Sequence, residues 1–408
     1  MKKKKLLFYF YNRLNDPLLQ SNIFQYMHAL AKTGFYDIAI VTYEDDKIPL
    51  SEKEKNQFHK TYREMGMRWY PLKWHAGSGL HLKAIDIFTG FFRIFYLSQV
   101  RGYRRIVTLG SIAGSFVYML SKLMPVKFYL YQYEPHSEYA LDNKIWKANS
   151  LQYRLLHAFE NRSLKSSAVI SSGTLSMQTR LKEMKVKARF FKVASVVNDK
   201  FFYFDIARRN EVRARLGIAG TDKLVIYPGK VGELYCSAAQ LLDTFNALHM
   251  QSAAYKFLVI TPGHAQFNML LGNAYSGLKA FITVLSPVPH HEMPCFLSAS
   301  DLGVVAVPPG FSKKFMSPIK IGEYLCSGLP YLICSDLEDS GITQERNIGV
   351  VVDDFTEAEI NRVADKITTL LQEPKNEQAA RCHAEGIALR GFDHQYREFK
   401  KAIEVLTD

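Results

Sequence analysis

The chain has 408 residues, of which 48% are hydrophobic and 13% aromatic, so it is long enough for two domains and too apolar for large-scale disorder. Its net charge of +13 is uneven: residues 1–200 hold 32 Lys and Arg against 15 Asp and Glu, and residues 201–408 hold 20 against 24. Such a basic half suits nucleic acid, anionic lipid head groups or an acidic acceptor. Since no zinc spacing, RNP-type run or basic zipper accompanies it, we expect no nucleic-acid partner and favour an anionic membrane surface or a lipid-linked acceptor.

The first residues mimic a signal peptide only briefly. A lysine run precedes an apolar run at residues 6–11, but polar residues 12–16 follow at once, without a small-residue cleavage site. We therefore expect a first buried strand. The five cysteines are odd in number and form no CxxC pair, which favours reduced thiols and a cytoplasmic location, peripheral on the inner face of the membrane if the basic half binds lipid.

The first half of the chain alternates apolar runs with helical patterns. Strands are predicted at 6–11, 38–42, 105–108, 126–131 and 168–171. Helices are predicted at 22–32, 51–65, 82–99, 113–123, 145–167 and 173–184. This alternation is typical of a parallel sheet covered by helices on both faces.

One of these segments has two interpretations. Residues 82–105 combine aromatic and aliphatic residues with a set of basic ones, namely Lys83, Arg93, Arg101, Arg104 and Arg105. A basic amphipathic helix of this kind can lie in a membrane interface. A helix packed on the core with a basic exposed end explains the same pattern, and the sequence favours neither.

The second half repeats the alternation. Strands are predicted at 224–227, 256–261, 281–285, 302–307, 331–334 and 349–352, with helices between them and an amphipathic helix at 393–407. The chain therefore has the pattern of two doubly wound α/β domains. Ligands of such sheets bind at the carboxyl ends of the strands, so we expect a site at the loops after Tyr227, Thr261, Leu285 and Val307.

Residues 317–330 form the most informative segment. Ser317 is a good N-cap, Pro318 suits the first helical position, and Gly328 suits a left-handed residue after the helix. Lys320 stands in the first turn, where a cation opposes the helix dipole, and a bound anion would relieve that opposition. A solvated lysine on an ordinary helix is the simpler alternative.

This segment resembles the nucleotide-sugar motif of GT-B glycosyltransferases of the retaining group called family 4. That family carries a pattern close to Ser-Pro-x-Lys-x-x-Glu-Tyr-Leu-Ala-x-Gly-x-Pro, matched here at Ser317, Pro318, Lys320, Glu323, Tyr324, Leu325, Gly328 and Pro330. Residues 224–231, 299–304 and 347–352 resemble flanking segments of the family in the same order. The resemblance covers roughly residues 220–400 and is only topological before 200.

The resemblance implies an α/β chain of the GT-B type, with two doubly wound Rossmann-like domains facing across a cleft. It places an acceptor domain at 1–203 and a nucleotide-sugar domain at 204–392. A last helix, 393–408, would pack back on the first domain.

The resemblance also implies how the donor is held. Glu323 would accept hydrogen bonds from the ribose hydroxyls, and Lys230, which follows Gly229, would neutralise the diphosphate and act in catalysis by stabilising the leaving group. Because this chain lacks two residues with which the family holds the donor, backbone N–H groups of Met316 and Ser317 would hold the sugar instead, and Lys313, Lys314 or Lys320 the second phosphate.

The chain departs from the family at three places. Phe315 stands eight residues before Glu323, where the family has another glutamate. Residues 233–237 contain no second lysine, and the loop at 17–23 contains no glycine pair. These departures leave the donor open and allow a degenerate, inactive enzyme.

Two loops hold further candidates. Glu134 and His136 follow a predicted strand in a region where the family often has a histidine near the reacting sugar, so they are candidates for acceptor positioning or proton transfer, or simply members of a polar loop. His290 and His291 are adjacent and therefore point apart, and no third ligand has suitable spacing. We read them as structural or near the base, and expect no metal and no cofactor other than the nucleotide diphosphate sugar.

We therefore expect a metal-independent glycosyltransferase that moves a sugar to a glycan or lipid-linked acceptor in cell-surface polysaccharide synthesis, and the resemblance alone implies that it is retaining. Two rivals remain: a GT-B sugar-nucleotide epimerase, and an inactive GT-B subunit that binds a partner glycosyltransferase. The base, the sugar, the linkage and the oligomeric state do not follow from the sequence.

Overall fold

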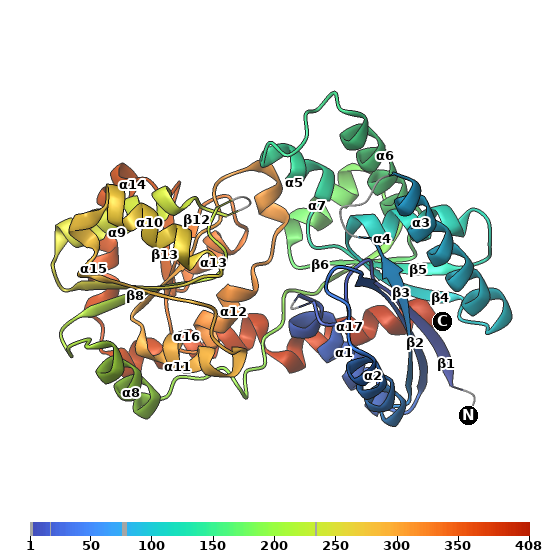
Figure 1. The fold of residues 1–408 in the computed structure, drawn as a ribbon, viewed down its shortest axis with the longest axis horizontal. Helices are drawn as coiled ribbons and strands as arrows, with labels where there is room; N and C mark the ends of the chain where they lie inside the picture. Colours follow the sequence, from blue (N-terminus) through green and yellow to red (C-terminus); the bar gives the residue numbers. More distant parts are fainter. Residues whose placement is uncertain (1–2, 17, 76–79, 233–234) are drawn as a thin grey trace. The chain divides into compact units, whose positions relative to one another are not determined.

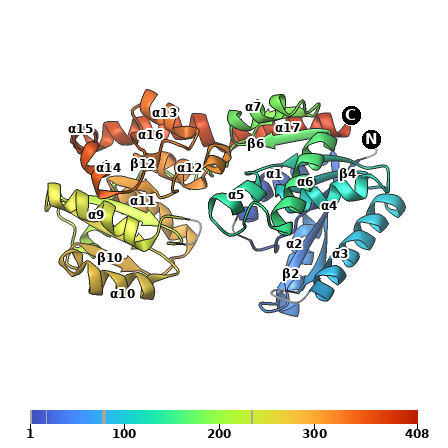
Figure 2. The ribbon, with the colours of Figure 1, turned by 90° about the horizontal axis from the view of Figure 1, so that it is seen from above.

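The computed structural model describes residues 3–16, 18–75, 80–232 and 235–408. The chain divides into two compact units, each built on one parallel sheet (Figures 1 and 2). The N-terminal unit comprises Met1–Ala194 and Gln395–Asp408, and the C-terminal unit comprises Ser195–His394. The predicted α/β class with two Rossmann-like domains is confirmed.

In the part of the chain that the structure describes, the N-terminal sheet has seven parallel strands in the order β3-β2-β1-β4-β5-β6-β7. They are β1 (Lys4–Tyr9), β2 (Tyr36–Asp45), β3 (Met67–Trp74), β4 (Arg105–Leu109), β5 (Lys127–Tyr131), β6 (Val169–Ser172) and β7 (Arg189–Lys192). The sequence prediction missed β3 and β7. Both are edge strands with alternating or partial burial, so they lack the continuous apolar run of a central parallel strand.

Helices cover both faces of this sheet. They are η1 (Leu19–Ile23), α1 (Phe24–Lys32), α2 (Glu52–Glu64), α3 (Leu80–Phe95), η2 (Tyr96–Val100), α4 (Gly110–Ser121), α5 (His136–Asp142), α6 (Leu151–Ser166), α7 (Leu175–Glu183) and, from Gln395 on, α17 (Phe392–Thr407). Figure 1 shows α1, α2 and α17 on one face and α3, α4 and α6 on the other. Successive residues of β5 meet the two layers: the Tyr129 ring lies 5.7 Å from that of Phe399, whereas Leu130 packs against Gly114 of α4.

In the described residues, the C-terminal sheet has six parallel strands in the order β10-β9-β8-β11-β12-β13, and all six were predicted. They are β8 (Lys223–Pro228), β9 (Tyr255–Ile260), β10 (Ile282–Leu285), β11 (Leu302–Val305), β12 (Tyr331–Cys334) and β13 (Gly349–Val352). Their side chains alternate between two cores. Val225 and Leu332 belong to one core, and Ile226 and Ile333 to the other.

Helices and short turns connect these strands. They are α8 (Ile206–Leu216), α9 (Ala238–Gln251), α10 (His264–Ala274), η3 (Ser276–Leu278), η4 (His290–Glu292), α11 (Met293–Ala299), η5 (Phe311–Phe315), α12 (Ile319–Cys326), α13 (Asp339–Glu345), α14 (Glu357–Arg362), α15 (Ala364–Gln372) and α16 (Lys375–Arg390). Among the described residues, no helix combines the length and the apolar character that a membrane crossing requires.

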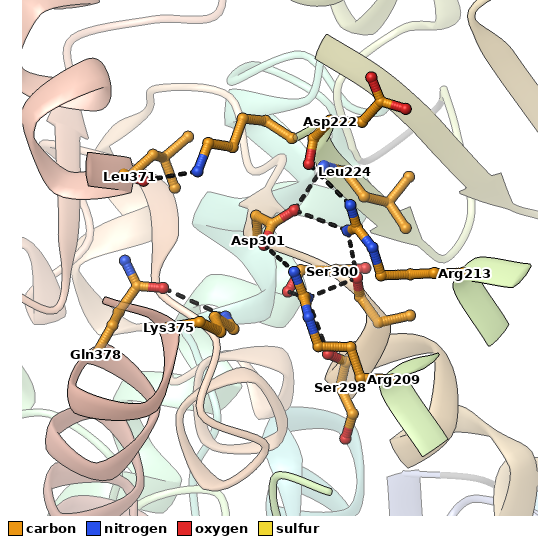
Figure 3. A network of polar contacts seen from close by, with 12 residues as sticks. Arg209, Arg213, Asp222, Leu224, Ser298, Ser300, Asp301, Leu371, Lys375 and Gln378 are labelled. Atoms are coloured by element: carbon orange, nitrogen blue, oxygen red, sulfur yellow. Dashed lines mark hydrogen bonds and ion pairs between the residues drawn. The ribbon is translucent and has the colours of Figure 1, made fainter. Parts of the chain in front are cut away.

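A buried ion cluster fastens α8 to the start of β8 and β11 (Figure 3). The Asp301 carboxylate accepts hydrogen bonds from Arg209 at 2.7 Å, from Arg213 at 3.1 Å and from the Leu224 amide at 2.8 Å. Burial alone would raise the pKa of Asp301, but the neighbouring Lys375 and arginine cations hold that pKa below its ordinary value. The carboxylate is therefore charged and compensated inside the C-terminal unit.

The segment that enters the C-terminal unit is tied to its last helices. Val197 forms a parallel bridge with Gly391, and the Val197 amide donates to the Arg390 carbonyl at 3.0 Å. The Ser195 amide donates to Ser317 Oγ at 3.2 Å. Residues 195–203, assigned to the first domain by the sequence, lie in this unit.

Candidate functional site

Two adjacent strands of the C-terminal sheet mark the candidate site. From β8 the chain continues to β9 on one side, whereas β11 lies on the other side and continues to β12. The carboxyl ends of two strands at such a reversal open a crevice in which α/β proteins bind ligands. Gly229 and Lys230 follow β8 directly, and α12 begins in the segment after β11.

Gly229 is required by its conformation and by its surroundings. Its φ of +146° lies outside the range that side chains tolerate, and its amide donates to the Ile260 carbonyl at 2.8 Å. A Cβ at this position would lie 2.5 Å from the Nζ atom of Lys320. The ammonium group of the motif helix therefore sits directly against the backbone of the β8 loop.

Lys320 lies in an aromatic setting. Its Nζ atom is 4.5 Å from the ring centroid of Tyr227 and 5.4 Å from that of Tyr235, which are cation–π distances. Burial of the ammonium group lowers the pKa of Lys320 to about 8, against a smaller opposing effect of the Glu323 carboxylate. Lys320 is therefore mainly a cation at neutral pH, and it loses its charge when the pH rises above about 8.

The predicted cap of α12 is wrong. The capping residue is Pro318, and no side chain caps the helix. Instead, Ser317 Oγ accepts hydrogen bonds from the Ser195 amide and from Arg390, whose Nη1 atom lies 2.8 Å away. The buried guanidinium of Arg390 also binds Asp339, and this pair holds the serine away from the helix end.

The predicted end of α12 is confirmed. Gly328 has a φ of +70° and its amide donates to the Leu325 carbonyl, while the Leu329 amide donates to the Tyr324 carbonyl. These two bonds form a Schellman motif. A Cβ on Gly328 would lie 2.7 Å from that of Ala379, so the close approach of α16 requires glycine as well.

Glu323 lies in the second turn of α12 beside a histidine that the sequence placed only approximately. Its Oε1 atom is 3.6 Å from Nε2 of His290, and this carboxylate raises the pKa of His290. The imidazole also stacks against the ring of Phe201 at 5.8 Å. The sequence did not predict the contact between His290 and Glu323, because it depends on the fold and not on the spacing of the residues.

The remaining predicted donor residues are less closely grouped. Lys230 is exposed, and its carbonyl accepts a hydrogen bond from the Tyr227 hydroxyl. The Met316 amide donates to the Lys313 carbonyl at 2.9 Å, so a contact with a sugar would have to replace that bond. Phe315 is buried, and Lys314 lies 4.0 Å from the ring of Phe311. Of the segment without a second lysine, residues 233–234 lie outside the described residues.

Glu134 and His136 lie in the N-terminal unit, after β5. Both contact Ser111, which the sequence reasoning missed: Ser111 Oγ lies 3.5 Å from the Glu134 carbonyl and 3.4 Å from the His136 amide. Ser111 follows β4 at the reversal of strand order in this sheet, and that position was the available signal. Burial lowers the pKa of His136, so its imidazole is neutral at neutral pH.

Within the described parts of the chain, no three His, Cys, Asp or Glu side chains come together in a way that could hold a metal ion. The five cysteines carry free thiols, and four of them are buried.

No protein-family profile matches the sequence, and no curated protein is significantly similar to it. Solved structures do resemble it. Sucrose-phosphate synthase from Thermosynechococcus elongatus has a TM-score of 0.71 at 14% identity, over 99% of both chains. WaaG, a glycosyltransferase involved in lipopolysaccharide biosynthesis, has a TM-score of 0.66 at 15% identity, over 98% of this chain and 99% of its own. Anabaena HepE, solved with UDP and glucose, has a TM-score of 0.67 at 12% identity over the same shares. At these identities the likeness shows the fold, which is of the GT-B type.

Proposed function

We propose that this protein is a glycosyltransferase that takes a sugar from a nucleotide diphosphate sugar. The observation that carries the proposal is the contact of Lys320 with Gly229, with Glu323 three residues further along the same helix, at the reversal of strand order in a GT-B fold. The resembling structures include a sucrose-phosphate synthase, a glycosyltransferase of lipopolysaccharide biosynthesis, and a protein that was solved with UDP and glucose. These neighbours support glycosyl transfer and a uridine nucleotide as the first ligand to test.

The diphosphate would be neutralised by two lysines from different elements. Lys230 is exposed at the end of β8, and Lys320 reaches the same loop from α12. The family places a second cation on the β8 loop, where this chain has none at residues 233–237. Because the ammonium of Lys320 lies against Gly229, we propose that it replaces the missing loop cation.

These cations would act on the transition state more than on the bound donor. Transfer of the sugar leaves a nucleoside diphosphate whose negative charge grows as the bond breaks, and fixed cations stabilise that charge. A metal ion would not be needed for this step if Lys230 and Lys320 supply the charge. Retention at the anomeric carbon remains an expectation from the family resemblance.

Glu323 would hold the ribose. A carboxylate accepts hydrogen bonds from both hydroxyls of a diol, and each such charged bond contributes about 1.5–3 kcal/mol. His290 lies 3.6 Å from this carboxylate and would limit the directions in which it accepts. Backbone groups near Met316 and Ser317 remain candidates for the sugar.

The acceptor side of the proposal rests on the N-terminal unit. A neutral His136 can take a proton from an acceptor hydroxyl, and Glu134 can position that hydroxyl. The acceptor would be a glycan or a lipid-linked sugar of a cell-surface polysaccharide. The basic character of residues 1–200 supports an acceptor held at the inner face of a membrane.

The test is the thermal stability of the purified chain with UDP, GDP, ADP and CMP, each with and without magnesium. Ligand that binds the native state raises the melting temperature by mass action. We expect a rise with one diphosphate that magnesium does not change and that Glu323→Gln abolishes. Glu345→Gln, on the exposed side of α13, is the matched control and should keep the rise.

Each rival function predicts its own outcome, either in this test or when the chain is incubated with a nucleotide sugar and no acceptor. An inactive subunit gives no shift with any nucleotide. An epimerase binds the nucleotide and releases a free sugar from the nucleotide sugar with no acceptor present. Either result would replace the proposal.

A further inference from the structure

Helix α3 of the N-terminal unit has one buried face and one exposed face. Asp86, Gly90 and Ile94 lie on the inner face and are buried, and a Cβ on Gly90 would lie 2.0 Å from the hydroxyl of Tyr43. This face packs on the sheet. On such a helix of a globular protein, polar residues normally cover the exposed face.

The outer face of α3 and η2 is nonetheless apolar. We call it the α3 stripe, and its members, with their exposed fractions, are Ile85 (47%), Phe88 (62%), Phe92 (64%), Phe95 (44%), Tyr96 (42%) and Val100 (66%). Apart from the adjacent Phe95 and Tyr96, each member follows the one before it by three or four residues, which places the set along one side of the helix. Exposed apolar side chains that gather in this way indicate an interaction surface, whereas single ones need no explanation.

A cavity of about 430 Å³ lies beside the α3 stripe. Ile85, Phe92 and Tyr96 of the stripe form part of its lining. The end of β3 contributes Lys73, and α3 contributes Arg93, so the lining carries two cations. Its carboxylate, Asp86, is fully buried and accepts a hydrogen bond from the His75 amide at 3.1 Å.

The charge around the stripe indicates what covers it. Residues 80–105 contain five basic residues and a single acidic one, the buried Asp86. Arg101 and Arg104, at the end of the stripe, are exposed. A second copy of this chain would bring the same positive charge to the contact, and single-stranded nucleic acid would stack on rings but not on Ile85 or Val100. An anionic bilayer offers both hydrocarbon and negative charge.

We propose that the α3 stripe is a membrane-docking surface that lies in the interface of an anionic bilayer. The aromatic and aliphatic side chains enter the boundary between head groups and acyl chains, while Lys73 and Arg93 meet a phosphate-bearing head group at the cavity. This deepens the acceptor side of the proposed function, since a lipid-linked acceptor would then lie beside the acceptor unit. The docking itself requires neither the donor site nor a nucleotide.

The test is cosedimentation of the full chain with vesicles of phosphatidylcholine, with and without phosphatidylglycerol, in the absence of nucleotide. We expect binding only to the anionic vesicles, weakened by salt, and reduced at least about tenfold in the double variant Phe88→Ser and Phe92→Ser. The matched control is Met250→Ser with Met269→Ser, which removes two apolar side chains of the C-terminal unit that are at least as exposed as Phe88 and Phe92, and it should bind like the parent. Thermal unfolding of each variant verifies the fold.

Any of four outcomes would overturn the inference. The chain could ignore both kinds of vesicle, or the Phe88 and Phe92 double variant could bind as well as the parent. The parent could be a dimer that this double variant turns into a monomer, in which case the stripe is an interface between copies. The parent could bind single-stranded DNA through the same two rings. The nucleotide-induced thermal shift is measured separately, so a failure here leaves the donor site standing.

Discussion

In the C-terminal unit, helix α12 is packed so closely that glycine is needed where it meets its neighbours, whereas in the N-terminal unit helix α3 leaves a row of apolar side chains exposed. A Cβ on Gly303 of β11 would lie 2.6 Å from the ring of Tyr324, and one on Gly386 of α16 would lie 2.7 Å from the Cys326 amide. On α3, Phe92 is 64% exposed. Close packing restricts the residue types that a segment can contain, so its structure can be predicted from its sequence. The role of an exposed face depends instead on the partner that covers it.

The largest expected effect is on the ion cluster of the C-terminal unit. In Asp301→Asn, the guanidinium groups of Arg209 and Arg213 would lose their buried counter-charge, and we expect the free energy of unfolding to fall by about 3–5 kcal/mol. The three tryptophans, Trp69, Trp74 and Trp146, all lie in the N-terminal unit, so tryptophan fluorescence follows that unit while far-UV circular dichroism follows both. Urea unfolding recorded with both signals measures the loss.

The two signals also sharpen the comparison between the units. If the units unfold separately, Asp301→Asn moves the transition seen by circular dichroism and leaves the fluorescence transition in place. Glu345→Gln, which breaks an exposed pair with Arg346, should move neither. A fall of less than about 1 kcal/mol in Asp301→Asn would show that the cluster is not the fastening we describe.

A smaller effect is expected from filling the close contact of α12. Gly303→Ala would push a methyl group into the ring of Tyr324, and overpacking of this kind costs about 1–3 kcal/mol. Gly272→Ala, on α10 with open space around it, should stabilise the chain by up to about 1 kcal/mol. Phe88→Ser on the open α3 should change stability least. Urea unfolding of the three variants tests this order, and equal losses in Gly303→Ala and Phe88→Ser would remove the contrast between closed and open helices.

The same contrast explains what could be predicted from the sequence. All six strands of the C-terminal sheet were predicted, because each of them, the edge strands β10 and β13 included, is a short run rich in apolar residues. The glycine end of α12 was predicted because a left-handed residue demands glycine. The edge strands β3 and β7 were missed, since half-exposed strands need no continuous apolar run.

The site was predictable only in part for a related reason. Lys320 and Glu323 were predicted as site residues from a sequence motif. Their contacts with the β8 loop and with His290, however, join residues that are distant in the sequence. The misplaced cap at Ser317 has the same cause. Ser317 satisfies the local rule for a cap, but its hydroxyl oxygen accepts a hydrogen bond from the distant Arg390 instead of from the helix end.

Lys320 should give a pH-dependent effect on nucleotide binding. Its pKa of about 8 means that the ammonium loses its charge as the pH rises from 7 to 9, so the affinity for a nucleoside diphosphate should fall over that range. Lys320→Met should bind about 10- to 100-fold more weakly at pH 7, in line with the loss of one or two charged hydrogen bonds. Calorimetric titration at several pH values measures both effects.

The pH profile separates a direct contact from a structural role. If Lys320 binds the diphosphate, the decline between pH 7 and 9 disappears in the methionine variant. A variant that binds weakly but keeps the decline would mean that another group titrates there. Lys279→Met, an exposed lysine directly after η3 in the same unit, is the matched control and should keep both affinity and profile.

The smallest effect is expected at His290. Glu323 raises the pKa of His290, so the pair stabilises the fold when the imidazole is protonated, below its unfolded value near 6.5, and the contribution is lost as the pH rises through the folded pKa. Because the imidazole is 64% exposed, solvent screens the pair, and we expect His290→Gln to cost at most about 0.5 kcal/mol at pH 5.5 and nothing at pH 8.5. Unfolding at the two pH values measures the difference, with the neighbouring His291→Gln as the control that should show none. A saturating nucleotide should remove the difference at pH 5.5 as well if ribose hydroxyls take the Glu323 carboxylate, whereas a difference that persists would argue that the nucleotide does not reach Glu323.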